Sequence, residues 1–201
     1  GQGVMLEPTR PTVHLPNSMV RVYPVRKDQL DDQIHSFPLT LISHRLGELF
    51  WLMPCDGTPD AGAWDRPQAY DQEKLTPYYL STRFDDSLIQ TEFTPTERCG
   101  CFRFTFPSGK ATVLLANRMT GSLSGSNNVV MGVERFHDMQ AFVYGEFSAP
   151  VKMQPSIEGD KTRLIISGQA GKKQLEFRYG ISFISIDQAR KNLQTEIPGW
   201  S

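Results

Sequence analysis

Hydrophobic and polar residues alternate one by one over a short stretch in the middle of the chain. Between positions 101 and 106 the sequence reads CFRFTF, so Phe102, Phe104 and Phe106 share one side of an extended backbone and Arg103 lies on the other. Three aligned phenylalanines bury more apolar area than the opposite side can. We therefore predict a strand whose phenylalanine face meets a second sheet, with Arg103 pointing to solvent or to a partner.

Comparable short runs recur along the whole chain, and turn-forming sequences such as Pro107-Ser108-Gly109 separate them. Many short strands at this spacing predict an all-β fold, a β-sandwich of two antiparallel sheets in one domain over positions 1–201. The expected strands lie near residues 19–23, 37–42, 49–52, 78–83, 88–93, 99–106, 112–116, 122–125, 129–135, 141–147, 151–154, 163–167, 174–179 and 181–184.

One helix is predicted, at residues 185–197. Ser185 and Gln188 fit a capping box, in which the Ser185 hydroxyl accepts from the Gln188 amide and the Gln188 side chain reaches back. Apolar residues then recur at helical spacing, and Pro198-Gly199 stops the helix. Trp200 follows almost at once, so we expect either that the natural chain continues beyond Ser201 or that Trp200 docks back onto the sandwich.

The stretch 54–77 has no periodicity and contains four prolines, so it is predicted to be a long loop. It carries Trp64, Tyr70 and several aspartates, the kinds of side chain that stack on and hydrogen-bond to a sugar. A solvated loop anchored by Trp64 in a crevice explains the same residues.

Composition narrows the possible functions. The 201 residues carry 21 Lys and Arg against 22 Asp and Glu, a net charge of −1, so there is no basic footprint for nucleic acid. No apolar run approaches the roughly 18 residues needed to span a bilayer. Cys99 and Cys101 share one strand face; they could form a metal or redox pair, but two small packed residues are the favoured interpretation, since no further ligand lies nearby in sequence.

Familiar catalytic motifs for nucleophilic, nucleotide-binding and zinc chemistry are absent from the sequence. The four histidines, His14, His35, His44 and His137, form no metal-binding spacing. Asp85-Asp86 lies between two expected strands and is favoured as part of a hairpin turn. From pattern and composition alone, the chain is a β-sandwich without an assigned activity.

Three longer segments add a family resemblance. They read PTVHLPNSMVRVYP from Pro11, FDDSLIQTEFTPTERCGCFRFTFP from Phe84 and YGISFISIDQARKNLQTEIPGW from Tyr179. Together they resemble the N-terminal domain of glycoside hydrolase family 92, the calcium-dependent exo-α-mannosidases of bacteria. The resemblance implies a supersandwich-like β domain packed on a C-terminal (α/α)6 barrel. That barrel would hold the calcium and the acid and base carboxylates, so no cofactor is expected in this chain.

This resemblance implies an inverting α-mannosidase parent, an α-mannoside glycan as partner, and a periplasmic, secreted or cell-surface location in a bacterium. The chain alone is expected to be inactive, because the barrel motifs are missing from it. A free-standing carbohydrate-binding module with an aromatic platform, and a truncated remnant without activity, are the alternatives. The expected platform residues are Trp51, Trp64, Tyr78 and Tyr79.

Five residues are predicted to contact the glycan. The resemblance matches Ser43-His44 to a substrate-facing family loop and assigns His14 and Asn17 to the matched N-terminal segment. Trp51 and Trp64 are added from residue chemistry, because an indole offers a broad apolar face and one N–H donor. Trp51 also fits a core position, since it lies within the apolar run 49–53.

Overall fold

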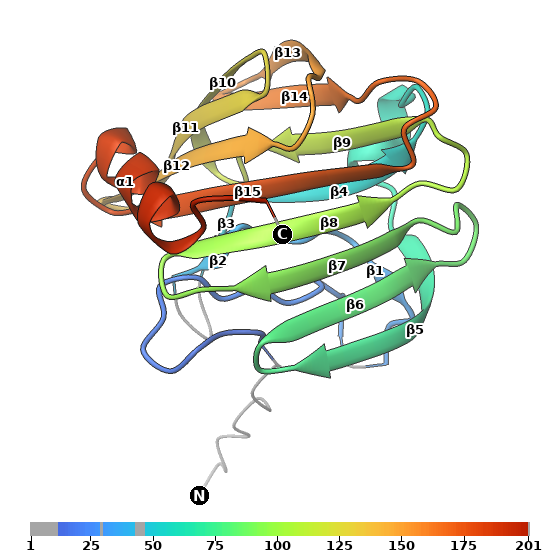
Figure 1. Ribbon diagram of the computed structural model, residues 1–201, viewed down its shortest axis with the longest axis horizontal. Coiled ribbons are helices and arrows are strands. Elements are labelled where there is room, and N and C mark those ends of the chain that lie inside the picture. Colours follow the sequence, from blue (N-terminus) through green and yellow to red (C-terminus); the bar gives the residue numbers. More distant parts are fainter. Residues whose placement is uncertain (1–11, 29, 43–46, 201) are drawn as a thin grey trace, which may run out of the picture.

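The protein is described by a computed structural model covering residues 12–28, 30–42 and 47–200. It is a β-sandwich of two antiparallel sheets, with a small third sheet and one α-helix at the left of the view in Figure 1. The larger sheet has nine strands, in the spatial order β1 (Gln33–Ile34), β5 (Gln68–Thr76), β6 (Tyr79–Phe84), β7 (Gln90–Pro95), β8 (Cys99–Thr105), β15 (Gln174–Ser182), β12 (Met139–Phe147), β11 (Val129–Phe136) and β10 (Thr120–Ser126).

The smaller sheets complete the sandwich. Four strands form the second layer, in the order β13 (Lys152–Glu158), β14 (Lys161–Ser167), β9 (Ala111–Ala116) and β4 (Trp51–Asp56). A two-stranded hairpin joins β2 (Thr40–Leu41) to β3 (Glu48–Leu49). The helical elements are a short 3-10 helix η1 (Ala61–Trp64) and the helix α1 (Ile186–Glu196). The predicted all-β, two-sheet class is confirmed.

Phenylalanine side chains fill the core, as the alternation in β8 predicts. Phe102, Phe104 and Phe106 are completely buried, and the rings of Phe102 and Phe104 stack with their centroids 5.6 Å apart. Arg103, on the opposite face, donates from Nε to Glu176 of β15 at 2.6 Å. The predicted register of this strand is therefore confirmed.

The predicted loop over 54–77 is wrong as a single loop. It contains the end of β4, the helix η1 and the nine-residue strand β5. Pro54 misled the prediction, but β4 is an edge strand, where a missing N–H is tolerated. None of the nine residues of β5 is buried, and its register shifts between Asp71 and Lys74, so it has no hydrophobic alternation to detect.

Other boundaries also differ from the predictions, among them the expected strand 37–42, of which only β2 and a bridge at Phe37 form. Residues 19–23 form no regular strand; Val22 makes only an isolated bridge to Val13. Residues 174–184 were expected to hold two strands, but β15 runs unbroken through Gly180. Gly180 is required there because a Cβ would lie 2.2 Å from the Ala189 carbonyl oxygen of α1. Its absence lets the helix pack directly on the strand.

The predicted helix is confirmed as α1, capped by Ser185. The Ser185 hydroxyl accepts from the Gln188 amide at 3.1 Å. The second half of the expected capping box is not formed, because Gln188 Nε2 donates to Asn192 Oδ1 at 2.9 Å instead. Asn192 in turn donates to the Ile181 carbonyl of β15, which fixes α1 against the outer face of the larger sheet.

Cys99 and Cys101 lie on that same outer face, and neither forms a disulfide. Burial raises the pKa of Cys99 to about 12 and that of Cys101 to about 11. Both are therefore neutral thiols at physiological pH, which fits the packing interpretation better than a metal or redox pair.

Candidate functional site

Pro16 and Asn17 form an exposed turn within residues 12–22, the dark blue segment in the lower part of Figure 1. Two backbone hydrogen bonds between Val13 and Val22, at 2.8 and 3.1 Å, join the chain segments on either side of this turn. Asn17 has the left-handed φ of 60°, a conformation that asparagine tolerates better than most residues. His14 is half-buried, with Nδ1 3.0 Å from the carbonyl oxygen of Leu15. The segment therefore forms an ordered polar turn.

Two neighbouring elements hold this turn. The Met19 amide donates to the Glu97 carbonyl in the β7–β8 turn at 2.6 Å. On the other side, the Thr40 hydroxyl of β2 donates to the Met19 carbonyl at 2.7 Å. The Pro16-Asn17 turn therefore lies between the β7–β8 turn and the β2–β3 hairpin. The predicted residue His44 belongs to that hairpin's loop, at positions outside the described residues.

The C-terminal helix ends at the same place. The Glu196 carboxylate accepts from the Thr96 hydroxyl at 2.5 Å and from the Arg98 amide at 2.9 Å, and it pairs with Arg98 Nε at 2.5 Å. Burial alone would raise the pKa of Glu196, but the hydrogen bonds from Thr96 and Arg98 outweigh burial and lower it. Residues 19, 97 and 196, far apart in sequence, thus meet in one corner, hereafter the Glu196 corner.

A second buried carboxylate holds the base of the β2–β3 hairpin. Glu134 of β11 is fully buried, and it accepts backbone hydrogen bonds from Phe50, Arg118 and Met119 at 2.7–2.9 Å. Phe50, between β3 and β4, has the left-handed φ of 61° that this contact helps to stabilise. Burial raises the pKa of Glu134, although the backbone amides oppose that shift. Glu134 is thus a positioning residue for the hairpin.

The two predicted tryptophans form a cluster of their own on the smaller sheet. Trp51, at the start of β4, is only 8% exposed, and its ring centroid lies 5.5 Å from that of Trp64 in η1. The guanidinium of Arg163 in β14 covers Trp64 at 4.9 Å. Trp51 is therefore a core residue, the alternative that its place in the apolar run 49–53 predicted. A sugar contact by Trp64 stays a prediction, as do the roles of His14, Asn17 and His44.

Trp200 docks back onto the larger sheet, one of the two expected outcomes for it. The guanidinium of Arg178 lies 4.5 Å from the Trp200 ring, and it donates to the Ile197 carbonyl at 2.8 Å and to Glu146 at 2.6 Å. Trp200 and Tyr79 help to line a groove of about 340 Å³ over β6, β7 and β8. The chain segment that follows α1 is thereby held in a defined direction.

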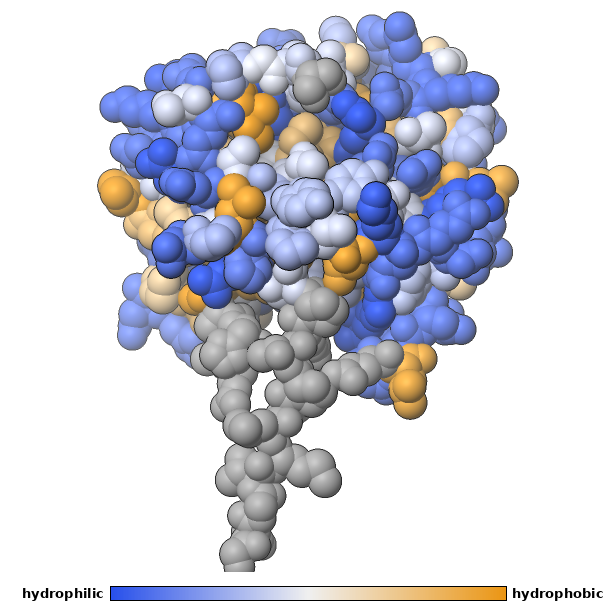
Figure 2. Space-filling model, turned by 60° about the horizontal axis from the view of Figure 1, so that its bottom comes forward, coloured by the Kyte–Doolittle hydropathy of each residue, from blue (hydrophilic) through white to orange (hydrophobic). Residues whose placement is uncertain are grey.

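The lower end of the molecule is mainly hydrophilic. Figure 2 brings the lower end of the molecule forward and shows hydrophobic residues there as separate spots among polar ones. Within the described ranges, no group of three or more His, Cys, Asp or Glu side chains is arranged to hold a metal ion. Nor does any helix in those ranges have the length and apolar character to cross a membrane.

Sequence reasoning missed Glu134 and Glu196. Glu196 belongs to the EIPGW segment that carries the family resemblance. Its hydrogen-bond partners are about 100 residues away in sequence, so no local pattern indicates its role. Glu134 has a weaker signal: it occupies an inward position of β11, in line with the buried Val130 and Gly132, where an apolar residue is expected.

Comparisons with known proteins identify the family and the fold of the chain. The model of the glycosyl hydrolase family 92 N-terminal domain matches residues 2–185. Among solved structures, the family GH92 inverting mannosidase BT2199 from Bacteroides thetaiotaomicron VPI-5482 has a TM-score of 0.84 and 23% identity, over 95% of this chain and 31% of that chain. The family GH92 glycosyl hydrolase ccman5 gives 0.79 and 17%, over 95% and 32%.

The α-mannosidase BT3965 from Bacteroides thetaiotaomicron gives a TM-score of 0.75 and 18% identity, over 95% of this chain and 33% of that chain. No curated protein matches the sequence. The chain therefore spans about a third of the length of the solved structures that share its fold.

Proposed function

Because the chain belongs to the glycosyl hydrolase family 92 N-terminal domain family, we propose that it is the non-catalytic sandwich half of an α-mannosidase-like glycosidase. In this proposal it contributes glycan-contacting loops to a cleft shared with a C-terminal (α/α)6 domain. That second domain supplies the calcium and the catalytic carboxylates. The enzyme acts on α-mannoside glycans outside the bacterial cytoplasm, in the periplasm, at the cell surface or after secretion.

The observation that carries the proposal is the Glu196 corner. Each of the three family-like segments has a residue there: Met19 from the first, Glu97 from the second and Glu196 from the third. The exposed Pro16-Asn17 turn lies just before Met19, the residue through which the first segment joins this corner. A turn held by two other parts of the chain, the β7–β8 turn and β2, is preorganised, which lowers the conformational cost of contacting a ligand.

Within the cleft, His14, Asn17 and His44 are assigned to the glycan. Imidazole and amide groups donate and accept hydrogen bonds, as sugar hydroxyls require. Trp64 belongs to the same predicted set, whereas the burial of Trp51 gives it a packing role beneath Trp64. The same burial weighs against a free-standing binding module, because two of the aromatic residues expected for its platform, Trp51 and Trp64, pack against each other, and Arg163 covers the Trp64 ring.

The reaction itself requires the other half. An inverting glycosidase places a general acid and a general base roughly 6.5–9.5 Å apart, on opposite sides of the scissile bond. We assign neither role to a carboxylate of this chain. Among the described residues, the enclosed carboxylates Glu134, Glu176 and Glu196 are all occupied by structural hydrogen bonds or ion pairs.

The purified chain, supplied with calcium, should therefore not hydrolyse aryl α-mannosides or α-mannobiose. The reference is a buffer blank and a boiled sample of the same preparation. Turnover that survives stringent purification and disappears when a carboxylate of this chain is substituted would overturn the proposal.

A further inference from the structure

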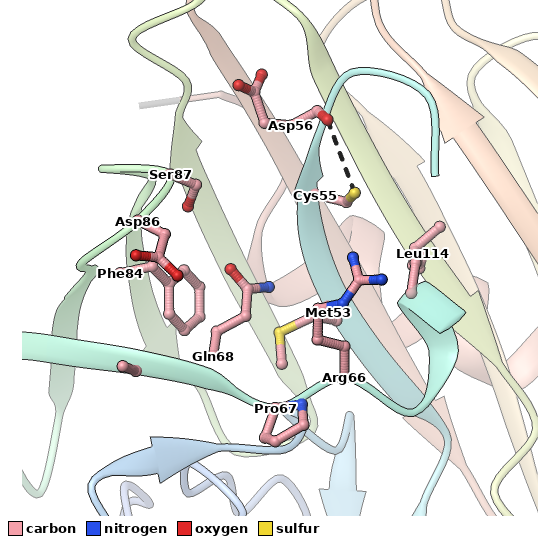
Figure 3. A pocket seen from close by; sticks show the side chains of 12 residues that line it. Met53, Cys55, Asp56, Arg66, Pro67, Gln68, Phe84, Asp86, Ser87 and Leu114 are labelled. Carbon is pink, nitrogen blue, oxygen red and sulfur yellow. Dashed lines mark hydrogen bonds between the residues drawn. The ribbon is translucent and has the colours of Figure 1, made fainter. Parts of the chain in front are cut away.

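A cavity with both polar and apolar lining residues lies away from the Glu196 corner, beside the end of β4. It has a volume of about 270 Å³, and β4, the segment from η1 into β5, and the β6–β7 turn surround it. Figure 3 shows Asp86 and Ser87 on one side of the cavity and Met53, Cys55 and Arg66 on the other, with Gln68 between them. None of the described residues that line it belongs to the Pro16-Asn17 turn or to the β2–β3 hairpin. We call it the β4 pocket.

The walls of the β4 pocket are fixed before any ligand arrives. Gln68 Nε2 donates to the Pro54 carbonyl at 3.0 Å, so the amide oxygen is turned to the side of Asp86 and Ser87 (Figure 3). The β6–β7 turn is anchored by the Asp85 amide, which donates to the Ala69 carbonyl at 3.0 Å. Because these contacts already order the lining groups, binding would cost little conformational entropy.

The lining combines a few polar groups with apolar surface, the usual composition of a small-molecule site. Pro67 and Ala69, both partly exposed, provide apolar contact. The Gln68 oxygen and the Asp86 carboxylate can accept hydrogen bonds, and the Ser87 hydroxyl can donate one. This alternation of acceptors, donors and apolar surface matches a ring that carries hydroxyl groups at its edge and C–H groups on its faces.

The size and charge of the β4 pocket further restrict the class of ligand that it can bind. A cavity of about 270 Å³ lies just below the usual range for drug-sized ligands, so it suits a single small ring. Asp56 and Asp86 line it, while the one cation in the lining, Arg66, is paired through Nη2 with both oxygens of Asp60 at 2.9 and 2.8 Å. The surplus of carboxylates disfavours phosphate or carboxylate ligands.

We propose that the β4 pocket binds one neutral pyranose ring, as an ancillary glycan site separate from the cleft of the proposed enzyme. Hydroxyls of the sugar donate to Asp86 and Gln68 and accept from Ser87, and the ring faces contact Pro67 and Ala69. A ligand of this size held by a few hydrogen bonds should bind with a Kd on the order of 1 mM.

The test is a titration of the isotope-labelled chain, followed by NMR, with the neutral methyl α-glycosides of mannose, glucose and galactose. For at least one of them we expect saturable shifts of the Gln68, Asp86 and Ser87 amides. Asp86→Ala should weaken that binding about tenfold, because a sugar hydroxyl loses its charged acceptor. The matched control is Asp85→Ala, which changes an exposed aspartate of the same turn that does not line the pocket and should leave the Kd unchanged.

Saturable shifts in the wild-type chain that Asp86→Ala does not weaken, or that Asp85→Ala weakens equally, would overturn the proposal. So would the absence of saturable shifts with all three glycosides, or preferential binding of glucosamine or a sugar phosphate. Asn17→Ala, which alters the proposed enzyme cleft, should not change this titration. A negative titration at the β4 pocket would therefore not contradict the proposed function, and a hydrolysis result that contradicts the proposed function would not contradict this binding site.

Discussion

Replacing Glu196 by alanine should destabilise the sandwich more than any comparable change to a surface carboxylate. The substitution removes the acceptor of the Thr96 hydroxyl, the Arg98 amide and the Arg98 guanidinium together. The Glu196 side chain is only 11% exposed, so water cannot fully replace it as an acceptor.

The size of the effect follows from these three contacts. The hydroxyl and the amide each lose a hydrogen bond to a charged acceptor, worth about 1–1.5 kcal/mol apiece in a partly buried setting. The Arg98 side chain is 39% exposed, so its ion pair adds no more than about 1 kcal/mol. The expected loss is about 3 kcal/mol, a large share of the roughly 5–15 kcal/mol typical of a folded domain.

Equilibrium unfolding in urea measures this loss. With a denaturant dependence of about 3 kcal/mol/M, the midpoint should fall by about 1 M. Glu97→Ala is the matched control, since Glu97 is an exposed neighbour that contributes only its backbone carbonyl to the corner and should cost less than about 0.5 kcal/mol. If Glu196→Ala lowers the midpoint no further than Glu97→Ala does, the corner does not tie the three segments together as argued.

Three further outcomes follow from the structure. Ser185→Ala removes the N-cap of α1 and should cost about 1 kcal/mol in the same urea assay; an unchanged midpoint would count against the cap. Gly180→Ala should cost at least about 2 kcal/mol and reduce the helical circular dichroism signal, because the new Cβ meets the backbone of Ala189; a variant as stable as wild type would show that the helix shifts freely. Because the pKa of Glu196 is lowered in the folded state, the part of its stabilisation that depends on its charge is present above its ordinary pKa of 4.5 and is lost as the pH falls through the folded value. The stability difference between wild type and Glu196→Ala should therefore narrow in acid, and a difference that does not change with pH would refute this linkage.

Much of the architecture was predictable because it depends on local patterns. The alternation around Phe102, Phe104 and Phe106 fixes which face of β8 is buried, and the Ser185 cap with its apolar spacing fixes where α1 begins. β5 escaped prediction for a physical reason: it is an exposed, bulged strand near the sheet edge, so hydrophobicity does not mark its faces. Its existence depends on pairing with β6 rather than on its own composition.

The candidate site was less predictable than the fold. Nothing local joins Met19, Glu97 and Glu196, whose contacts exist only once the sheet has formed. The family resemblance identified the segments that meet, but not the carboxylate that joins two of them. Trp51 illustrates the opposite difficulty, since an indole suits a sugar ring and a hydrophobic core equally well, and only its 8% exposure decides between the two roles.

The central claim is that this sandwich supplies glycan contacts to a cleft completed by another domain. The most direct test is the rate of hydrolysis of an aryl α-mannoside, with calcium, by this chain combined with the (α/α)6 domain of a family 92 mannosidase. We predict turnover only in the combination, with kcat/KM lowered about tenfold by Asn17→Ala, as expected for one lost polar contact. Asn127→Ala, an exposed asparagine with a similar φ of 56° in the β10–β11 turn, should have no effect. Equal activity of the (α/α)6 domain without this chain, or equal effects of the two substitutions, would contradict the account.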